Sequence, residues 1–400
     1  MHIQLEHLPH VPVGQQQIEL VERKGLGHPD TMCDAIMEAI SVALCQAYIK
    51  ATGRVLHHNI DKSLLVAGQT APALGGGTVQ TPMRLIIGDR ATTTWDGQRV
   101  PVGDIAETTA RAWLATHLRF VDPDRHIVFQ NELRPGSAEL TDLFARERPG
   151  ANDTSAAVGY APLTETERCV LAAERWLNSP ALKEEFPEAG EDVKVMGSRR
   201  GRHLSLTVAL AMVDRFLPNE GVYFERKAAI CGKLRQYLEA ELCELDGVEV
   251  HLNTLDAPGR GLGGMYLTVL GTSAECGDGG QVGRGNRVNG VISLNRPMST
   301  EAAAGKNPVC HVGKIYNLLS HQIAHHIYTV VEPVQEAYVW LCSQIGAPLE
   351  APWMVSAQVL LAPGTALVDV QGPIQEIMEA ELADMPAFVD RLVHGTIPVW

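Results

Sequence analysis

Apolar residues in the first third of the chain recur first at helical and then at strand spacing. A helix is predicted from Asp30, a suitable N-cap residue, because apolar positions follow it at intervals of three and four residues (Ile36, Ile40, Ala43, Leu44 and Ala47). The Gly-rich turn at 74–77 separates two apolar runs that are typical of strands. The same criteria predict strands over 63–70, 84–89 and 126–131 and a second helix over 104–118.

The segment 149–163 interrupts this alternation. Its small and turn-forming residues predict a mobile or ligand-contacting loop. Thr164 then begins a helix, and Glu167 completes a capping box with it. Beyond this helix we predict strands over 204–213, 248–254, 265–272, 336–344 and 354–362 and helices over 223–243 and 312–330. The order strand, long helix, strand, strand recurs about three times, which indicates an α/β (α+β) fold with several similar units.

Composition narrows the class of protein. The 400 residues exceed one ordinary core, so two or three domains are expected. A net charge of -14 without a long basic run argues against nucleic acid or a membrane surface as a partner. The apolar run 204–213 is too short to span a membrane, and the N-terminus lacks the apolar region of an export signal. Eight cysteines without a C-x-x-C pair indicate reduced thiols in a cytoplasmic protein, with zinc ligation as a weak alternative.

The stretch 271–314 carries the strongest chemical signal. It contains nine glycines and only three acids, together with five basic residues, Arg284, Arg287, Arg296, Lys306 and Lys314. Glycine lets backbone N–H groups approach phosphate oxygens, and the basic side chains supply charge. An ordinary surface loop explains one such segment equally well, but two in succession favour a polyphosphate site. The stretch is not a P-loop, because Thr300 and Asn307 occupy positions that the P-loop pattern reserves for other residues.

His28 and Asp30 lie at the start of the first predicted helix. The amide groups and dipole of a helix N-terminus favour an anion or its metal complex. The alternative is that Asp30 only caps the helix and His28 only lines a turn.

Five motifs carry a family resemblance. In order, they are VERKGLGHPDTMCDAI, PGANDTSAAVGYAPLTETER, GEDVKVMG, GTSAECGDGGQVGRGNRVNG and EAAAGKNPVCHVGKIYN. Together they resemble the archaeal-type branch of the methionine adenosyltransferase (S-adenosylmethionine synthetase) family over residues 15–365. The resemblance implies three similar α/β domains with pseudo-threefold symmetry and a homodimer with active sites between subunits. It also implies ATP and L-methionine as substrates, with two Mg²⁺ ions and K⁺.

The three units are expected to be interleaved. Their approximate limits are 1–135 with the GHPD loop, 136–260 as the central unit and 261–400 with the Gly-rich loops.

The resemblance also implies roles for single residues. The residues expected to act in catalysis are His28, Lys194, Arg284 and Lys306. Further ATP contacts are expected from Glu22, Asp192, His311 and Lys314, and methionine contacts from Asp153 and Asp278. Asp30 is expected to bind Mg²⁺, and Asp61 is a candidate for a second metal ligand. Lys62, where the family pattern has an acid, and Cys310, where Asn is usual, leave the second metal and the K⁺ site open.

The implied reaction fits these residue types. The methionine sulfur attacks C5′ of ATP and expels triphosphate, which is then hydrolysed to pyrophosphate and phosphate. A thioether has no proton to lose, so the reaction needs no general base. Fixed cations stabilise the charge that gathers on the leaving group, and carboxylates suit the ammonium and sulfonium groups.

Three alternative functions fit parts of this pattern. A kinase or ligase would leave the motifs of Asp153 and Asp278 unexplained. A non-catalytic regulatory paralogue would be expected to lose its charged motif residues, which are present here. A transferase specialised for a methionine analogue is left open by the departures at Lys62 and Cys310.

Overall fold

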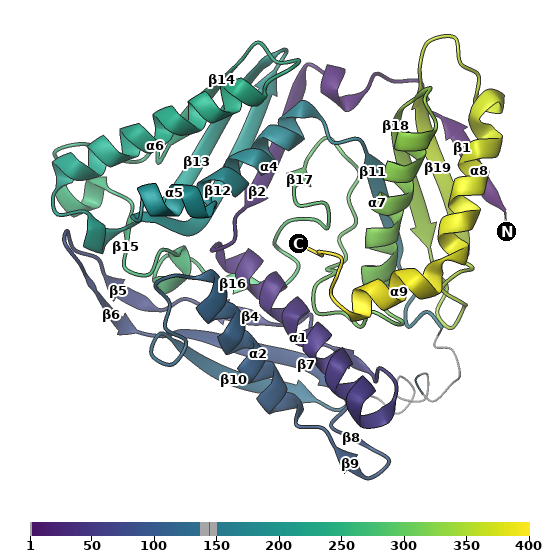
Figure 1. Cartoon of the computed structure of the whole chain (residues 1–400), viewed down its shortest axis with the longest axis horizontal. Coiled ribbons are helices and arrows are strands. Elements are labelled where there is room, and N and C mark those ends of the chain that lie inside the picture. The colour runs from purple at the N-terminus through teal and green to yellow at the C-terminus, as the bar shows by residue number, and fades with distance from the viewer. Residues whose placement is uncertain (1, 137–143, 145–149) are drawn as a thin grey trace.

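The computed structural model describes residues 2–136, 144 and 150–400. Within these residues, three larger β-sheets each pack one face against a group of helices and enclose a separate hydrophobic core (Figure 1). The chain is therefore a mixed α/β protein built from three sheet-and-helix units, which we name by the order in which their first long helices occur.

The first unit holds helices α1 (Pro29–Thr52) and α2 (Val102–His117). Its sheet has the order β10 (Ile127–Arg134), β7 (Met83–Ala91), β4 (Leu64–Val66) and β16 (Gly280–Gln281), and β3 (His58–Asn59) also pairs with β7. Two small hairpins flank it, β5 (Gln69–Ala71) with β6 (Thr78–Thr81) and β8 (Thr94–Trp95) with β9 (Gln98–Arg99).

The second unit holds helices α4 (Glu165–Leu177), α5 (Pro180–Glu185) and α6 (Glu220–Glu241). Its sheet has the order β14 (Gly247–Leu252), β13 (His203–Val213), β12 (Ala189–Arg200), β2 (Ile18–Lys24) and β17 (Ile292–Ser293), and β15 (Leu267–Thr268) also pairs with β13. Short 3₁₀ turns lie at η2 (Asp214–Phe216), η3 (Gly261–Gly264) and η4 (Ser273–Glu275).

The third unit holds helices α7 (Val312–Val330), α8 (Leu367–Ala383) and α9 (Met385–Val393). Its sheet has the order β1 (Ile3–His7), β19 (Met354–Leu361), β18 (Val334–Cys342) and β11 (Ala156–Ala161), and the 3₁₀ turn η1 (Val13–Gln15) follows β1.

The units exchange strands over long distances in the sequence. β1 and β2 leave the N-terminal segment to pair with β19 in the third unit and β12 in the second. The Gly-rich stretch contributes β16 to the first sheet and β17 to the second, before α7 enters the third. This threading holds the Gly-rich stretch against the N-terminal part of α1 and the C-terminal end of β2.

Most predicted elements are confirmed to within a few residues. The helix predicted over 312–330 coincides with α7, and the Thr164–Glu167 capping box is present in full. Several predictions were wrong in detail. The N-cap of α1 is His28 rather than Asp30, because the His28 side chain accepts the Asp30 backbone N–H.

One predicted loop, one predicted strand and the C-terminal region also differ from the prediction. Within the predicted loop 149–163, residues 156–161 form strand β11, whereas Pro149 lies outside the described residues. Of the strand predicted over 265–272, only Leu267–Thr268 is extended and paired, and η4 follows it. Helices α8 and α9 were not predicted.

Helix α1 is long and apolar enough to cross a membrane by length and composition alone, and within the described residues no other helix meets that test. However, 67% of its most apolar window is buried inside the protein. It packs against α2 and the first sheet, as a core helix does.

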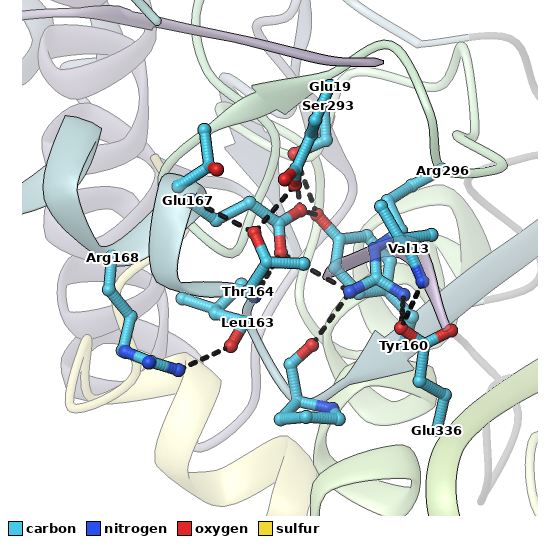
Figure 2. A network of polar contacts seen from close by, with 12 residues as sticks. Val13, Glu19, Tyr160, Leu163, Thr164, Glu167, Arg168, Ser293, Arg296 and Glu336 are labelled. Atoms are coloured by element: carbon cyan, nitrogen blue, oxygen red, sulfur yellow. Dashed lines mark hydrogen bonds and ion pairs between the residues drawn. The ribbon is translucent and has the colours of Figure 1, made fainter. Parts of the chain in front are cut away.

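A buried polar network joins the second and third units (Figure 2). The fully buried guanidinium of Arg296 lies 3.4 Å from Glu167 of α4 and 3.1 Å from Glu336 of β18. It also donates hydrogen bonds to the Tyr338 hydroxyl and the Pro162 carbonyl, and it stacks over the ring of Tyr160 at 4.5 Å. Arg296 belongs to the basic set of the Gly-rich stretch, but its charge is used between two glutamates and not for a ligand.

Candidate active site

The predicted site residues fall into two groups along α1. The first group lies beside the N-terminus of α1 and consists of Glu22, His28, Asp30, Asp192, Lys194, Asp278 and Arg284. The second group lies beside the middle of α1: Asp61, Lys306, His311 and Lys314. Two residues of α1 mark the positions of the groups. Beside the first group, Asp30 accepts a hydrogen bond from the Gln281 backbone N–H, and beside the second, Glu38 accepts one from the Gly305 backbone N–H. Eight residues of helix separate these contacts by about 12 Å.

The first group is built on a tight turn between β2 and α1. Gly27 has no room for a side chain, because a Cβ there would lie 2.5 Å from the Glu191 carbonyl carbon. Its N–H donates to the Glu191 carbonyl oxygen at 2.9 Å, which fixes the turn on β12. The turn therefore delivers His28 directly to the N-cap of α1.

His28 is neutral at pH 7. Burial lowers its pKa to about 4, and the charges of Lys24 and Lys194 act in the same direction, although Asp30 opposes them. The ring Nδ1 accepts the Asp30 N–H at 3.2 Å, so the proton of the neutral ring lies on Nε2. His28 can thus donate a hydrogen bond to a ligand but carries no charge, unlike Lys194, Arg284 and Lys306, the other residues expected to act in catalysis.

Lys24 also lies in the first group, although the sequence analysis did not name it as a site residue. Its Nζ donates to Asp30 Oδ2 at 2.9 Å and to the Arg284 carbonyl oxygen at 2.5 Å. It lies opposite Lys194 in the β2–β12 pair, and Glu22 contacts both ammonium groups, at 4.0 and 3.5 Å. Lys24 lies within the motif VERKGLGHPD, so the signal that could have revealed it was its position there.

Asp192 and Asp278 differ in exposure. Asp192 is buried and accepts hydrogen bonds from Ser273 N at 2.8 Å and Ser273 Oγ at 2.5 Å, so it holds the start of η4. Burial raises its pKa to about 6, and the charge of Asp278 contributes. Asp278 is exposed, and its backbone N–H is bonded to the Ser273 carbonyl oxygen. Asp192 thus supports the loop, and Asp278 is available to a ligand.

Arg284 and Lys194 are the accessible cations of the first group. The Arg284 side chain is exposed and makes no hydrogen bond or ion pair within the described residues. The Lys194 side chain is 43% exposed. Arg284 can therefore reach an anion without leaving another partner, whereas Lys194 has its 3.5 Å contact with Glu22 to give up.

The second group is centred on Lys306, whose side chain is only 5% exposed. Its ammonium pairs with Glu301 and lies 3.8 Å from Asp61 Oδ2. Asp61 is also contacted by Lys62 Nζ at 2.7 Å, and the same ammonium lies 4.0 Å from Asp89 Oδ2. Although burial opposes the change, Lys62, Asp89 and Lys306 together lower the pKa of Asp61.

His311 and Lys314 are buried at the start of α7. His311 is the N-cap, and its Nδ1 accepts the Gly313 N–H at 3.2 Å, the same arrangement as His28 at α1. Burial, together with the charge of Lys306, lowers the pKa of His311 to about 3. The side chain of Lys314 is fully buried and paired with both carboxylate oxygens of Glu38 at 2.6 and 2.8 Å.

Asp153 lies beside the second group and away from Asp278. The neighbouring Asn152 donates its backbone N–H to the Cys310 carbonyl oxygen at 3.1 Å. The backbone carbonyl oxygen of Asp153 accepts a hydrogen bond from the Ser343 hydroxyl. The Asp153 side chain is exposed. The two carboxylates predicted for methionine therefore lie at different groups of one chain, Asp278 in the first and Asp153 beside the second.

No set of three or more His, Cys, Asp or Glu residues that could hold a metal ion occurs in the described part of the chain. Mg²⁺ at phosphate sites commonly uses only one or two carboxylates and completes its shell with phosphates and water. Asp30 fits this use, since its carboxylate already holds a cation, the Lys24 ammonium, at 2.9 Å.

A protein-family model described as S-adenosylmethionine synthetase (AdoMet synthetase) matches residues 1–396. The chain is 46% identical to the S-adenosylmethionine synthase of Methanothrix thermoacetophila, over 100% of this chain and 99% of that protein. It is 47% identical to that of Thermococcus onnurineus, over 100% and 98%, and 44% identical to that of Pyrococcus furiosus, over 100% and 99%.

A solved structure described as an unusual S-adenosylmethionine synthetase from Campylobacter jejuni has a similar fold. The TM-score is 0.63 over 95% of this chain and 94% of that chain, with 15% sequence identity.

Proposed function

Because the chain belongs to the S-adenosylmethionine synthetase family and is a methionine adenosyltransferase using ATP and L-methionine, we propose that the two groups along α1 form its active site. The observation that carries this proposal is the concentration of fixed cations around the Gly-rich stretch. The enzyme forms S-adenosylmethionine and releases pyrophosphate and phosphate.

We propose that Arg284, Lys194 and Lys306 stabilise the departing triphosphate. Charge develops on the bridging oxygen as the C5′–O bond breaks, and preorganised donors stabilise it without reorganisation. His28 adds a hydrogen bond from Nε2 rather than a charge. Four further residues are proposed to shape the ATP site by holding neighbouring residues in place: Glu22, Asp192, His311 and Lys314. Their bonds to other protein residues support this role.

The two exposed carboxylates are proposed for L-methionine. Asp278 and Asp153 have the sign that suits an ammonium group and a developing sulfonium. Nothing in the reaction requires a base, because the thioether attacks without losing a proton.

Asp30 is proposed as the Mg²⁺ ligand, with the metal neutralising phosphate charge when it is bound. Asp61 is proposed as a ligand of a second Mg²⁺, supported by its Oδ1, which has no hydrogen-bond partner among the described residues. A K⁺ ion is proposed from the family resemblance alone.

We propose that two copies of the chain assemble so that the first group of one faces the second group of the other. The separation of Asp153 from Asp278 supports this, because neither group alone supplies all predicted contacts. The open face of the first sheet also exposes Leu64, Val66 and Val128 at 41 to 46%, as an apolar face awaiting a partner would.

The three units are proposed to be related by pseudo-threefold symmetry, with the approximate limits 1–135, 136–260 and 261–400. Each unit pairs one sheet with a layer of helices, and α1 and α7 share a histidine N-cap, which supports the proposal. A cytoplasmic location is proposed because all eight cysteines are free.

Incubation with ATP, Mg²⁺ and L-methionine should yield S-adenosylmethionine, pyrophosphate and phosphate. Mass spectrometry of the products, with a panel of thioether amino acids in place of L-methionine, checks this and measures substrate range. ADP or AMP as the nucleotide product would contradict the proposal. Preference for another thioether would favour the specialised transferase, and absence of any product with folded protein would favour the regulatory paralogue.

Replacing Asp30 by Asn should lower turnover and raise the Mg²⁺ concentration needed for half-maximal activity. The physical reason is that the amide keeps the hydrogen bond from Gln281 but loses the charge that attracts the metal. A magnesium titration of initial rates checks this, with Asp104→Asn as the control, because Asp104 is also a first-turn aspartate but is exposed and lies on α2. An unchanged magnesium titration in Asp30→Asn would remove Asp30 from the metal site.

A further inference from the structure

Asp34 lies one helical turn after Asp30 on α1 and faces residues 280–287, which we call the arginine loop because they carry Arg284. The carboxylate of Asp34 is 3% exposed. Its Oδ1 accepts the backbone N–H of Gly283 at 2.8 Å, and its Oδ2 lies directly against the backbone of Gly285. Asp34 therefore contacts the arginine loop on both sides of Arg284.

Asp30 and Asp34 contact alternate residues of the arginine loop. Asp30 Oδ1 accepts the Gln281 N–H at 2.9 Å, and Asp34 Oδ1 accepts that of Gly283. Four residues of helix rise about 6 Å, and the loop turns between these contacts, since the Arg284 N–H donates to the Gln281 carbonyl oxygen at 3.3 Å. One turn of α1 thus corresponds to two residues of the arginine loop, and the carboxylates of Asp30 and Asp34 fix the register of the loop on the helix.

The loop is also held by one of its own side chains. Arg287 donates to the carbonyl oxygens of Gly283 and Gly285 at 2.8 and 3.0 Å. A Cβ on Gly285 would lie 2.1 Å from Asp34 Oδ2, so the backbone can approach the carboxylate only because this residue is glycine. Burial raises the pKa of Asp34 to about 7, opposed by the Gly283 hydrogen bond and the charge of Arg287. The Asp34 carboxyl group thus occupies a site where burial disfavours its negative charge.

The two aspartates differ in what else they bind. Asp30 also holds Lys24 and is the proposed metal ligand, whereas the described bonds of the Asp34 side chain all go to the arginine loop. We propose that Asp34 is a positioning residue that anchors the arginine loop to α1, so that Arg284 stays directed at the triphosphate while Asp30 binds a cation. This rests on the proposed role of Arg284.

The first measurement separates this proposal from the function on which it rests. Arg284→Ala alone should lower kcat strongly, and unchanged activity would instead overturn the proposed role of Arg284. If Arg284 acts as proposed, Asp34→Ala should lower kcat by up to about 100-fold, the size of effect expected from misplacing a catalytic group by about 1 Å. The KM for L-methionine should change little.

A double-mutant cycle tests whether Asp34 acts through Arg284. Asp34→Ala in the Arg284→Ala background should cost little further activity, because the group that it positions is already absent. Losses that multiply in the double variant would overturn the proposal. Asp104→Ala is the matched control, an exposed helix aspartate outside the site, and it should leave activity unchanged.

Two further variants decide the matter if Asp34→Ala does not fold. Asp34→Asn keeps one acceptor oxygen for Gly283 and should retain more activity than Gly285→Ala, which displaces the loop from Asp34. Hydrogen exchange should show faster exchange of amides 281–285 in Gly285→Ala, with the rest of α1 unchanged. Normal exchange and activity in Gly285→Ala would contradict the anchoring role.

Discussion

Replacing Lys306 by Met should lower kcat by about 10²–10³-fold, the loss seen when one preorganised electrostatic donor is removed. Lys306 is almost fully buried between Glu301 and Asp61, so its charge acts through little water. That charge matters most as the triphosphate leaves, and methionine affinity should therefore stay nearly unchanged. Single-turnover kinetics measures the chemical step, and calorimetry with a non-hydrolysable ATP analogue measures binding of each substrate.

Lys62→Met is the matched control for this experiment. Lys62 also contacts Asp61, at 2.7 Å, but its side chain is 67% exposed and screened by water. It should therefore change kcat much less than Lys306→Met. Both variants must first be shown to be folded and to have the wild-type oligomeric state. If Lys306→Met lost only methionine affinity, its assignment to the triphosphate would be wrong.

Arg296→Met should reduce the free energy of unfolding by about 3–5 kcal/mol, the usual effect of removing one partner from a buried ion pair. The variant leaves Glu167 and Glu336 buried without the cation between them, and it removes one of the links between the second and third units. Urea denaturation, followed by circular dichroism and by tryptophan fluorescence, measures the change and tests whether the units still unfold together.

The control for this prediction is Arg202→Met. Arg202 makes an ion pair of similar length, 2.8 Å to Asp246, but both side chains are about half exposed, at 62 and 49%. Exposed pairs contribute about 1 kcal/mol or less, so this variant should unfold close to wild type. An Arg296→Met variant as stable as Arg202→Met would show that the network in Figure 2 does not hold the units together.

The sequence by itself determined the local features of this protein. The periodicity of 312–330 predicted α7, and the Thr164–Glu167 capping box was recognised, because a cap and a helical face depend on residues within one or two turns. The ordered motifs identified the family, and the comparisons confirm it. The roles of single site residues stay predictions, since the motifs name the residues and leave open what each contacts.

The tertiary structure decided which residues meet and which charges remain available. β2, β16 and β17 pair across hundreds of residues, so no local pattern could place Lys24 opposite Lys194 or Asp34 on the arginine loop. The neutral state of His28 depends on burial by distant segments. Arg296 and Arg284 look alike in the sequence, yet one is enclosed between two glutamates and the other is exposed, because only packing determines how much water surrounds a charge.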